Sequence, residues 1–104
     1  MCMGTFTFEW DEHKNILNQL KHKIAFEEAM TVFYDVNAVS FDDPEHSSDE
    51  ERFLIIGISE KEKLCIVSHC YRGKDDNIIR IISARKATKK ETKYYCDNRG
   101  RDEL

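Results

Sequence analysis

The chain has 104 residues, of which 40% are hydrophobic and 35% are charged, and its formal net charge is −4. This length suits one domain with a thin core. We therefore predict a single domain over residues 1–104, folded over about 5–96 and ending in a polar tail at 97–104. No segment approaches the roughly 18–20 apolar residues that span a bilayer, and the first residues lack the features of a secretory signal. These properties argue against a membrane protein or a membrane partner and favour the cytoplasm.

The charge is divided unevenly along the chain. Residues 1–52 carry four Lys and Arg against twelve Asp and Glu, whereas residues 53–104 carry twelve against eight. From Arg80 to Lys93 six basic residues stand against one acid, Glu91. A basic stretch in an acidic chain suggests a local anion-binding surface, although a solvated helix face would give the same pattern.

The N-terminal part predicts a strand and two helices. Residues 5–10 alternate Thr and Glu with aromatic side chains, which is typical of a half-buried strand. Asp11 can cap a helix that runs to about His22. A second helix fits Phe26 to Tyr34, because apolar side chains recur there at helical spacing. We expect the first helix to turn inward an apolar stripe formed by Ile16, Leu17, Leu20 and Ile24.

Residues 36–51 carry the weakest secondary-structure signal. Residues 39–41 fit a short strand, whereas residues 42–51 are acidic, contain the only proline and predict a surface loop. Three largely apolar runs follow, separated by connections of hairpin length. They predict strands at 53–59, 63–71 and 78–84.

The last predicted element is a short helix at 89–96. Thr88 and Glu91 form the sequence pattern of a capping box that would start it. The predicted order is therefore strand, two helices, loop, three strands and helix. Strands joined by hairpins form a meander, so we predict an α+β fold in which a small antiparallel β-sheet packs with two N-terminal helices and a short C-terminal helix.

Several short strings stand in a specific order and spacing along residues 7–95. The most specific are His46-Ser47 with Glu50-Glu51-Arg52, and the run from Arg80 to Ala87. The others are Phe8-Glu9-Trp10-Asp11 with Lys14, Lys21-His22, Phe26-Glu27-Glu28-Ala29, Val32-Phe33 with Asp35, Ile56-Gly57 with Ser59, and Glu91 with Tyr95. In this arrangement the chain resembles the BrnT toxin family.

The resemblance implies a RelE-like fold and an endoribonuclease whose RNA cleavage inhibits translation. It also implies a BrnA-like antitoxin partner with a ribbon-helix-helix domain, and contact with operator DNA only through that antitoxin. Nothing in the sequence indicates a cofactor. A non-catalytic relative of the same fold, binding RNA or the antitoxin, remains the alternative.

Three positions depart from the family pattern, all at helix ends. Lys23 stands where the family usually has a glycine that closes the first helix, and a non-glycine residue in a left-handed conformation costs roughly 1 kcal/mol. Ala25 replaces a serine before the second helix, which removes an N-cap hydroxyl worth about 1 kcal/mol and leaves Glu28 with half a capping box. Val36 replaces a proline after Asp35. We expect effects on stability and helix geometry.

Metal-free RNA cleavage uses the 2′-hydroxyl as nucleophile and needs a base, an acid and cations for the anionic transition state. Arg80 and Arg85 are the first candidates for the cation, because a guanidinium binds two phosphate oxygens and stays charged. Their odd separation places them on opposite faces of a strand. Either Arg85 lies beyond the strand end, or only one of the two reaches the phosphate. His46 and Glu51 are the candidates for acid and base, with their roles left open.

Further residues could hold the RNA. The candidates are Arg52, Arg72, Lys86, Lys89, Lys93 and Tyr95. The alternatives are a solvated face for the lysines and core packing for the tyrosine. Cys65 and Cys70 point to opposite faces of their predicted strand, which argues against a metal site that would also use His69.

Overall fold

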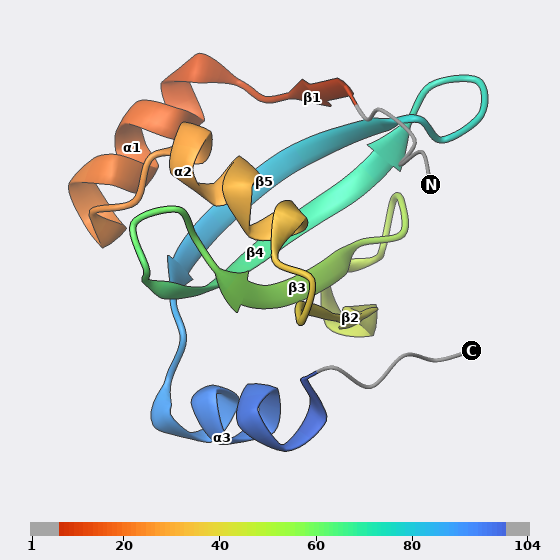
Figure 1. Ribbon diagram of the computed structural model, residues 1–104. Helices are drawn as coiled ribbons and strands as arrows, with labels where there is room; N and C mark the ends of the chain where they lie inside the picture. Colours follow the sequence, from red (N-terminus) through yellow and green to blue (C-terminus); the bar gives the residue numbers. More distant parts are fainter. Residues whose placement is uncertain (1–6, 100–104) are drawn as a thin grey trace.

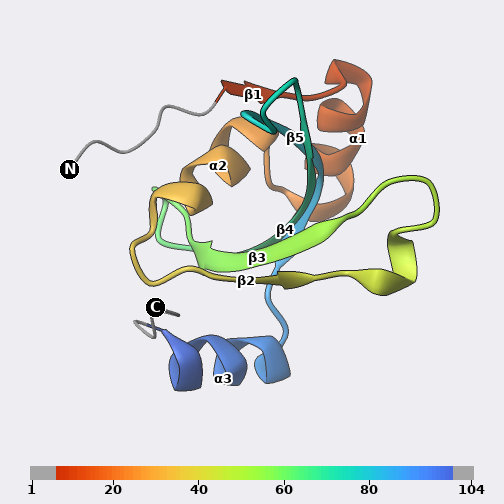
Figure 2. The same cartoon turned by 90° about the vertical axis from the view of Figure 1, so that its right-hand side faces the viewer.

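The computed structural model describes residues 7–99, so the predicted strand residues 5–6 and residues 100–104 of the predicted tail lie outside it. It consists of a five-stranded sheet with two helices on one face and one helix on the other (Figures 1 and 2). The elements are β1 (Thr7–Glu9), α1 (Glu12–His22), α2 (Phe26–Thr31), the 3-10 turn η1 (Val32–Tyr34), β2 (Val39–Asp42), the 3-10 turn η2 (Pro44–His46), β3 (Phe53–Ile58), β4 (Leu64–Arg72), β5 (Ile78–Lys86) and α3 (Lys89–Asn98).

The sheet confirms the α+β class and the predicted meander. Its strand order is β1-β5-β4-β3-β2, and the four strands β2 to β5 pair with one another in antiparallel fashion. β1 pairs with β5 in parallel, so the sheet is mixed rather than wholly antiparallel. The chain passes through α1 and α2 before it returns to the sheet, and this leaves β1 beside β5 at one edge (Figure 1).

Helix α1 forms where the sequence predicts it, but its buried face was predicted wrongly. Asp11 caps the helix by accepting from the backbone N–H groups of His13 and Lys14. The inward side chains are Asn15 and Asn18, 1% and 7% exposed. Of the predicted apolar stripe only Ile24 is buried, whereas the other three members are 50%, 49% and 69% exposed: Ile16, Leu17 and Leu20.

Hydrogen bonds explain why two asparagines face the protein interior. The Asn18 side-chain amide donates to the carbonyl oxygens of Ile24 and Ala84, and its oxygen accepts from the Ala84 N–H. The Asn15 oxygen accepts from the Phe26 N–H, the first amide of α2. These bonds satisfy buried backbone groups that no apolar side chain could satisfy.

At the two helix ends that depart from the family pattern, Lys23 and Ala25 behave as predicted and Glu28 does not. Lys23 closes α1 in the left-handed region, with φ 62° and ψ 26°. Ala25 caps α2 without a side-chain hydrogen bond. Glu28 does not form half a capping box. It is buried, accepts from the Ser59 hydroxyl and lies 3.8 Å from the Lys63 ammonium.

The main core lies between the sheet and the helices α1 and α2. It gathers side chains from α2, η1 and the inner positions of β3, β4 and β5, including Phe26, Val32, Val67 and Ile81. Gly57 in β3 lets η1 approach the sheet, because an added Cβ would lie 2.9 Å from the Val32 Cγ1. The family string Ile56-Gly57 therefore marks a close contact between a strand and a helix.

A smaller core lies on the opposite face of the sheet, beneath α3. Tyr95 is 3% exposed and packs on Ile56 and Ile66. Its hydroxyl donates to the Asp35 carboxylate at 2.7 Å, which also accepts from the Ile58 N–H. Burial opposes ionisation of Asp35, but these hydrogen bonds outweigh it and lower the pKa of the carboxyl. The tyrosine thus anchors α3 to one end of this face.

A β-bulge in β5 decides which residues share that face. Ser68 pairs with Ser83 and His69 with Ile81, so Ile82 has no partner on β4. One extra residue shifts the alternation of side chains, and Ile81 and Ala84, three apart, both enter the main core. Arg80 and Arg85 flank this pair and therefore lie on the same outer face. The prediction that they point to opposite faces was wrong. Arg85 lies within β5 and not beyond the end of the strand.

Candidate active site

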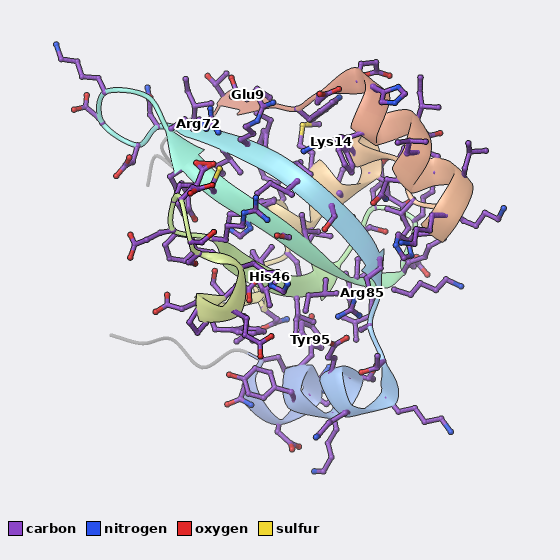
Figure 3. All side chains as sticks on the ribbon, turned by 180° about the vertical axis from the view of Figure 1, so that it is seen from behind. Glu9, Lys14, His46, Arg72, Arg85 and Tyr95 are labelled. Carbon is purple, nitrogen blue, oxygen red and sulfur yellow. The ribbon has the colours of Figure 1, made fainter. Side chains whose placement is uncertain are left out.

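A surface pocket of about 350 Å³ opens on the sheet face that carries α3. It lies between the outer faces of β3 to β5 and the loop that joins β2 to β3. The strands contribute Leu54, Ser68, Ile82, Ser83 and Arg85, and the loop contributes Asp43, Glu45, His46 and Arg52. Figure 3 shows His46 and Arg85 over this face, with α3 and Tyr95 below them.

His46 is held in the pocket by a carboxylate. Its Nδ1 lies 3.1 Å and 3.0 Å from the two carboxylate oxygens of Asp43. The Asp43 side chain is 12% exposed and the His46 side chain is 62% exposed. Within residues 7–99 the other ring nitrogen, Nε2, makes no protein hydrogen bond. An imidazole with one nitrogen bound and the other open to solvent can exchange a proton with a ligand.

The loop that carries His46 closes on itself. The Asp43 N–H donates to the Arg52 carbonyl oxygen at 2.9 Å. The Ser47 hydroxyl donates to the Asp43 carbonyl oxygen and accepts from the Arg52 N–H. These three bonds fix the two ends of the loop against each other, and they bring His46 and Arg52 to the same pocket.

Arg52 is the candidate arginine that is not already paired. Its Nε is shielded from solvent and has no hydrogen-bond partner, and its guanidinium makes no ion pair within the described residues. A buried donor without a partner costs about 1–3 kcal/mol. An anion in the pocket would remove that cost, so Arg52 is suited to bind a phosphate.

The other three candidate arginines each bind a carboxylate. Arg85 forms two hydrogen bonds of 2.9 Å with Glu91, Arg80 lies 2.9 Å from Glu9, and Arg72 lies 3.0 Å from Glu50. The hydrogen bonds that Arg85 donates to Glu91 raise the pKa of Arg85 and lower the pKa of Glu91. Only Arg85 among the three also lines the pocket.

The chain resembles known proteins over most of its length. The family model described as the ribonuclease toxin, BrnT, of type II toxin–antitoxin systems matches residues 10–91. The chain belongs to this family. A comparison with curated proteins finds no match. Among solved structures, the chain is similar to the crystal structure of the Brucella abortus ribonuclease toxin BrnT, at 24% sequence identity and a TM-score of 0.62, over 82% of this chain and 100% of that one.

Membership of the BrnT family confirms the resemblance seen in the sequence. It places the chain among ribonuclease toxins whose systems pair the toxin with an antitoxin. The solved structure supports the same α+β fold. No helix within residues 7–99 is long and apolar enough to cross a membrane.

The remaining predicted site residues, catalytic Glu51 and the RNA-binding candidates, lie at varied places on this BrnT-family chain. Glu51 is exposed and lies outside the pocket, in a shallow hollow with Arg52 and Phe53. The Tyr95 ring is buried beneath α3, which favours the core-packing alternative and leaves no exposed ring face for a base. The three lysines predicted to bind RNA are exposed: Lys86 at the end of β5, and Lys89 and Lys93 on α3.

The sequence reasoning missed Asp43 and Glu45 as members of the site. Both were assigned to an acidic surface loop, because their charge matched their neighbours. A signal was present: Asp43 precedes Pro44, and an Asp-Pro pair favours the start of a turn, here the turn that carries His46. On β4, the Cys65 side chain enters the main core and the Cys70 side chain does not. Within residues 7–99 no three His, Cys, Asp or Glu side chains converge as a metal site requires.

Proposed function

We propose that this BrnT-family toxin is a metal-independent endoribonuclease whose site is the pocket between His46, Arg52 and Arg85. The observation that carries the proposal is the joint presence of an unpaired guanidinium and a carboxylate-bound imidazole in one pocket. The first can bind a phosphate, and the second can move a proton at neutral pH. Translation would stop because messenger RNA is cut in the cytoplasm.

The reaction follows from the groups in the pocket. The 2′-hydroxyl of the RNA attacks the adjacent phosphorus, and the bond from phosphorus to the 5′-oxygen breaks. Arg52 binds the non-bridging phosphate oxygens and stabilises the charge that grows on them. His46 exchanges a proton with the reacting oxygens, and Glu45 and Glu51 are the nearby carboxylates. Exposed Lys86, Lys89 and Lys93 lie where they could attract the RNA backbone.

One observation favours the alternative, a relative that binds RNA or the antitoxin without cutting. Arg72, Arg80 and Arg85 are all engaged with carboxylates. If these pairs persist in the bound state, the three arginines hold the fold together and only Arg52 meets a phosphate.

A cleavage assay separates the two functions. Purified protein is incubated with RNA in EDTA, wild type beside Arg52→Ala and His46→Gln, and the product ends are identified. We expect wild type to leave 2′,3′-cyclic phosphate ends and both variants to lose most of the cleavage. Each variant must melt at a temperature close to wild type. Intact RNA at stoichiometric wild-type protein would establish the non-cutting alternative.

The partner of the toxin is proposed to be a BrnA-like antitoxin with a ribbon-helix-helix domain, through which alone the pair contacts operator DNA. We propose that an antitoxin segment covers the basic surface from Arg80 to Lys93. Charge steering would then speed association, and added salt would slow it. Association rates measured between 50 mM and 500 mM salt test this, and a rate that does not change with salt would contradict it.

A further inference from the structure

We propose that Asp43 is the positioning residue of the site, which holds His46 so that its Nε2 acts as the general base on the 2′-hydroxyl. This inference rests on the proposed ribonuclease function and assigns a role within it. Asp43 does not belong to the set of residues that the sequence singled out. It enters through the structure, as the one carboxylate among residues 7–99 that hydrogen-bonds to the His46 ring.

The geometry of the pair favours a positioning role over a surface ion pair. Both carboxylate oxygens of Asp43 lie within 3.1 Å of the same nitrogen, Nδ1. The carboxylate is nearly buried, and burying a carboxylate is costly unless it has partners. His46 supplies that partner. In an exposed pair of long side chains, the carboxylate would not be buried and its two oxygens would not both lie close to the same nitrogen.

The backbone around Asp43 is fixed by bonds that do not involve the His46 ring. Its N–H donates to the Arg52 carbonyl oxygen, and its carbonyl oxygen accepts from the Ser47 hydroxyl and from the His46 N–H. The carboxylate is therefore held by the β2–β3 loop. His46 sits on the 3-10 turn that Asp43 precedes, three residues on. The loop thus sets the direction of the imidazole before any RNA binds.

The contact dictates which nitrogen carries the proton. A carboxylate accepts hydrogen bonds, so Nδ1 must be the protonated nitrogen of the neutral ring. Nε2 then has a free lone pair, and it can take a proton. A base oriented and charge-stabilised by a carboxylate through its other nitrogen is a known device in hydrolases.

The proton and electron balance of the step can be written in full. The 2′-O–H bond breaks, its proton moves to Nε2, and its electron pair forms the new bond to phosphorus. The bond from phosphorus to the 5′-oxygen breaks, and the 5′-oxygen takes a proton from a water molecule at the open side of the pocket. The imidazolium returns its proton to the hydroxide so formed. Asp43 stays ionised throughout and faces the imidazolium while it exists.

The test combines kinetics with the protonation of the ring. Asp43→Asn keeps the size of the side chain and its neighbours' backbone bonds, and Asp49→Asn removes the same charge from an exposed position in the same loop. We expect Asp43→Asn to lower kcat by about 100-fold or more, as loss of an orienting carboxylate does, with KM changed by less than about two-fold. Asp49→Asn should cut RNA like wild type. In a His46→Gln background, Asp43→Asn should cause no further loss.

Nitrogen-15 NMR of the histidine ring reads the contact without activity. Wild type should show His46 protonated at Nδ1 when neutral, and Asp43→Asn should shift the population toward the Nε2–H form. Wild-type cleavage that Asp43→Asn leaves unchanged overturns the inference but not the ribonuclease. Equal losses in the wild-type and His46→Gln backgrounds, or a wild-type ring protonated at Nε2, also overturn it. Intact RNA with wild type overturns both proposals.

Discussion

Arg85 and Glu91 are joined by two parallel hydrogen bonds, each 2.9 Å long, between the end of β5 and the first turn of α3. The same carboxylate accepts from the Thr88 N–H and completes the capping box that starts the helix. Glu91 therefore links the cap of α3 to a strand that lines the candidate pocket. Arg85 has two potential roles, as a structural link to α3 and as a ligand of the RNA phosphate.

Two single variants distinguish these roles of Arg85. Glu91→Gln removes the carboxylate charge and leaves the guanidinium free, whereas Arg85→Ala removes the guanidinium. If Arg85 binds the phosphate, we expect Arg85→Ala to lose RNA cleavage by at least about 100-fold, while Glu91→Gln retains it within about three-fold. Cleavage and melting temperature are measured for both. Equal losses in the two variants would show that Arg85 acts only by holding α3.

A buried histidine predicts how the stability of the fold changes with pH. His69 is fully buried among Phe33, Phe53 and Tyr71, and its Nε2 has no hydrogen-bond partner. Burial lowers the pKa of His69 from 6.5 to about 4. The neutral ring is thus favoured in the fold, so its contribution to stability is complete above about pH 6.5 and is lost as pH falls toward 4. The loss is on the order of 3 kcal/mol.

His69→Phe should remove this part of the pH dependence. The free energy of unfolding, measured by urea titration between pH 4 and pH 7, should fall less steeply with decreasing pH in His69→Phe than in wild type. Since carboxylates also titrate in this range, the difference between the two slopes is the quantity to compare. His13→Gln, which changes an exposed histidine, serves as the control. Parallel slopes for wild type and His69→Phe would mean that folding does not lower the pKa of His69.

A glycine at the end of α1 should stabilise the protein. Lys23 has φ 62°, a conformation that glycine adopts at little cost. We expect Lys23→Gly to raise the free energy of unfolding by about 1 kcal/mol. Lys21→Gly, within the last turn of the same helix, should lower it by a similar amount. If both substitutions destabilise the fold, the left-handed conformation of residue 23 is not retained in solution.

Local features of the fold could be predicted from the sequence, and those set by distant contacts could not. The Asp11 cap and the Thr88–Glu91 capping box join residues fewer than four positions apart, and both were predicted from the sequence. The bulge at Ile82 is different, because it depends on the pairing of β5 with β4. No pattern within β5 reveals the extra residue, so the alternation rule placed Arg80 and Arg85 on opposite faces.

The candidate site shows the same division. Arg85, His46 and Arg52 were named from their residue types and the family strings, and the structure brings all three to one pocket. Arg80 and Arg72 were named on the same grounds, yet they lie beside other carboxylates. The path of the β2–β3 loop over the sheet brings His46 and Arg52 to Arg85, whereas Arg80 lies beside β1. That path is fixed by the Ser47 hydroxyl and by backbone bonds between Asp43 and Arg52, which a sequence does not reveal.

The two faces of α1 offer a test in which the structure and the hydrophobic pattern predict opposite results. The pattern assigns Leu20 to the core, and the structure leaves it 69% exposed while Asn18 is 7% exposed. Asn18→Leu would leave the buried N–H and carbonyl oxygen of Ala84 without their partners, and the Ile24 carbonyl oxygen loses a bond as well. We expect a loss of about 3 kcal/mol in the free energy of unfolding. Leu20→Asn should change it by no more than about 0.5 kcal/mol.

The measurement is urea unfolding of the two variants beside wild type at pH 7, where His69 contributes fully. A large loss for Asn18→Leu with a small one for Leu20→Asn supports the polar contact between α1 and β5. The reverse order would mean that α1 is rotated about its axis and packs its leucines inward. In that case the Ala84 backbone would lose its side-chain partner, and the position of Arg85, the next residue of β5, would have to be determined again.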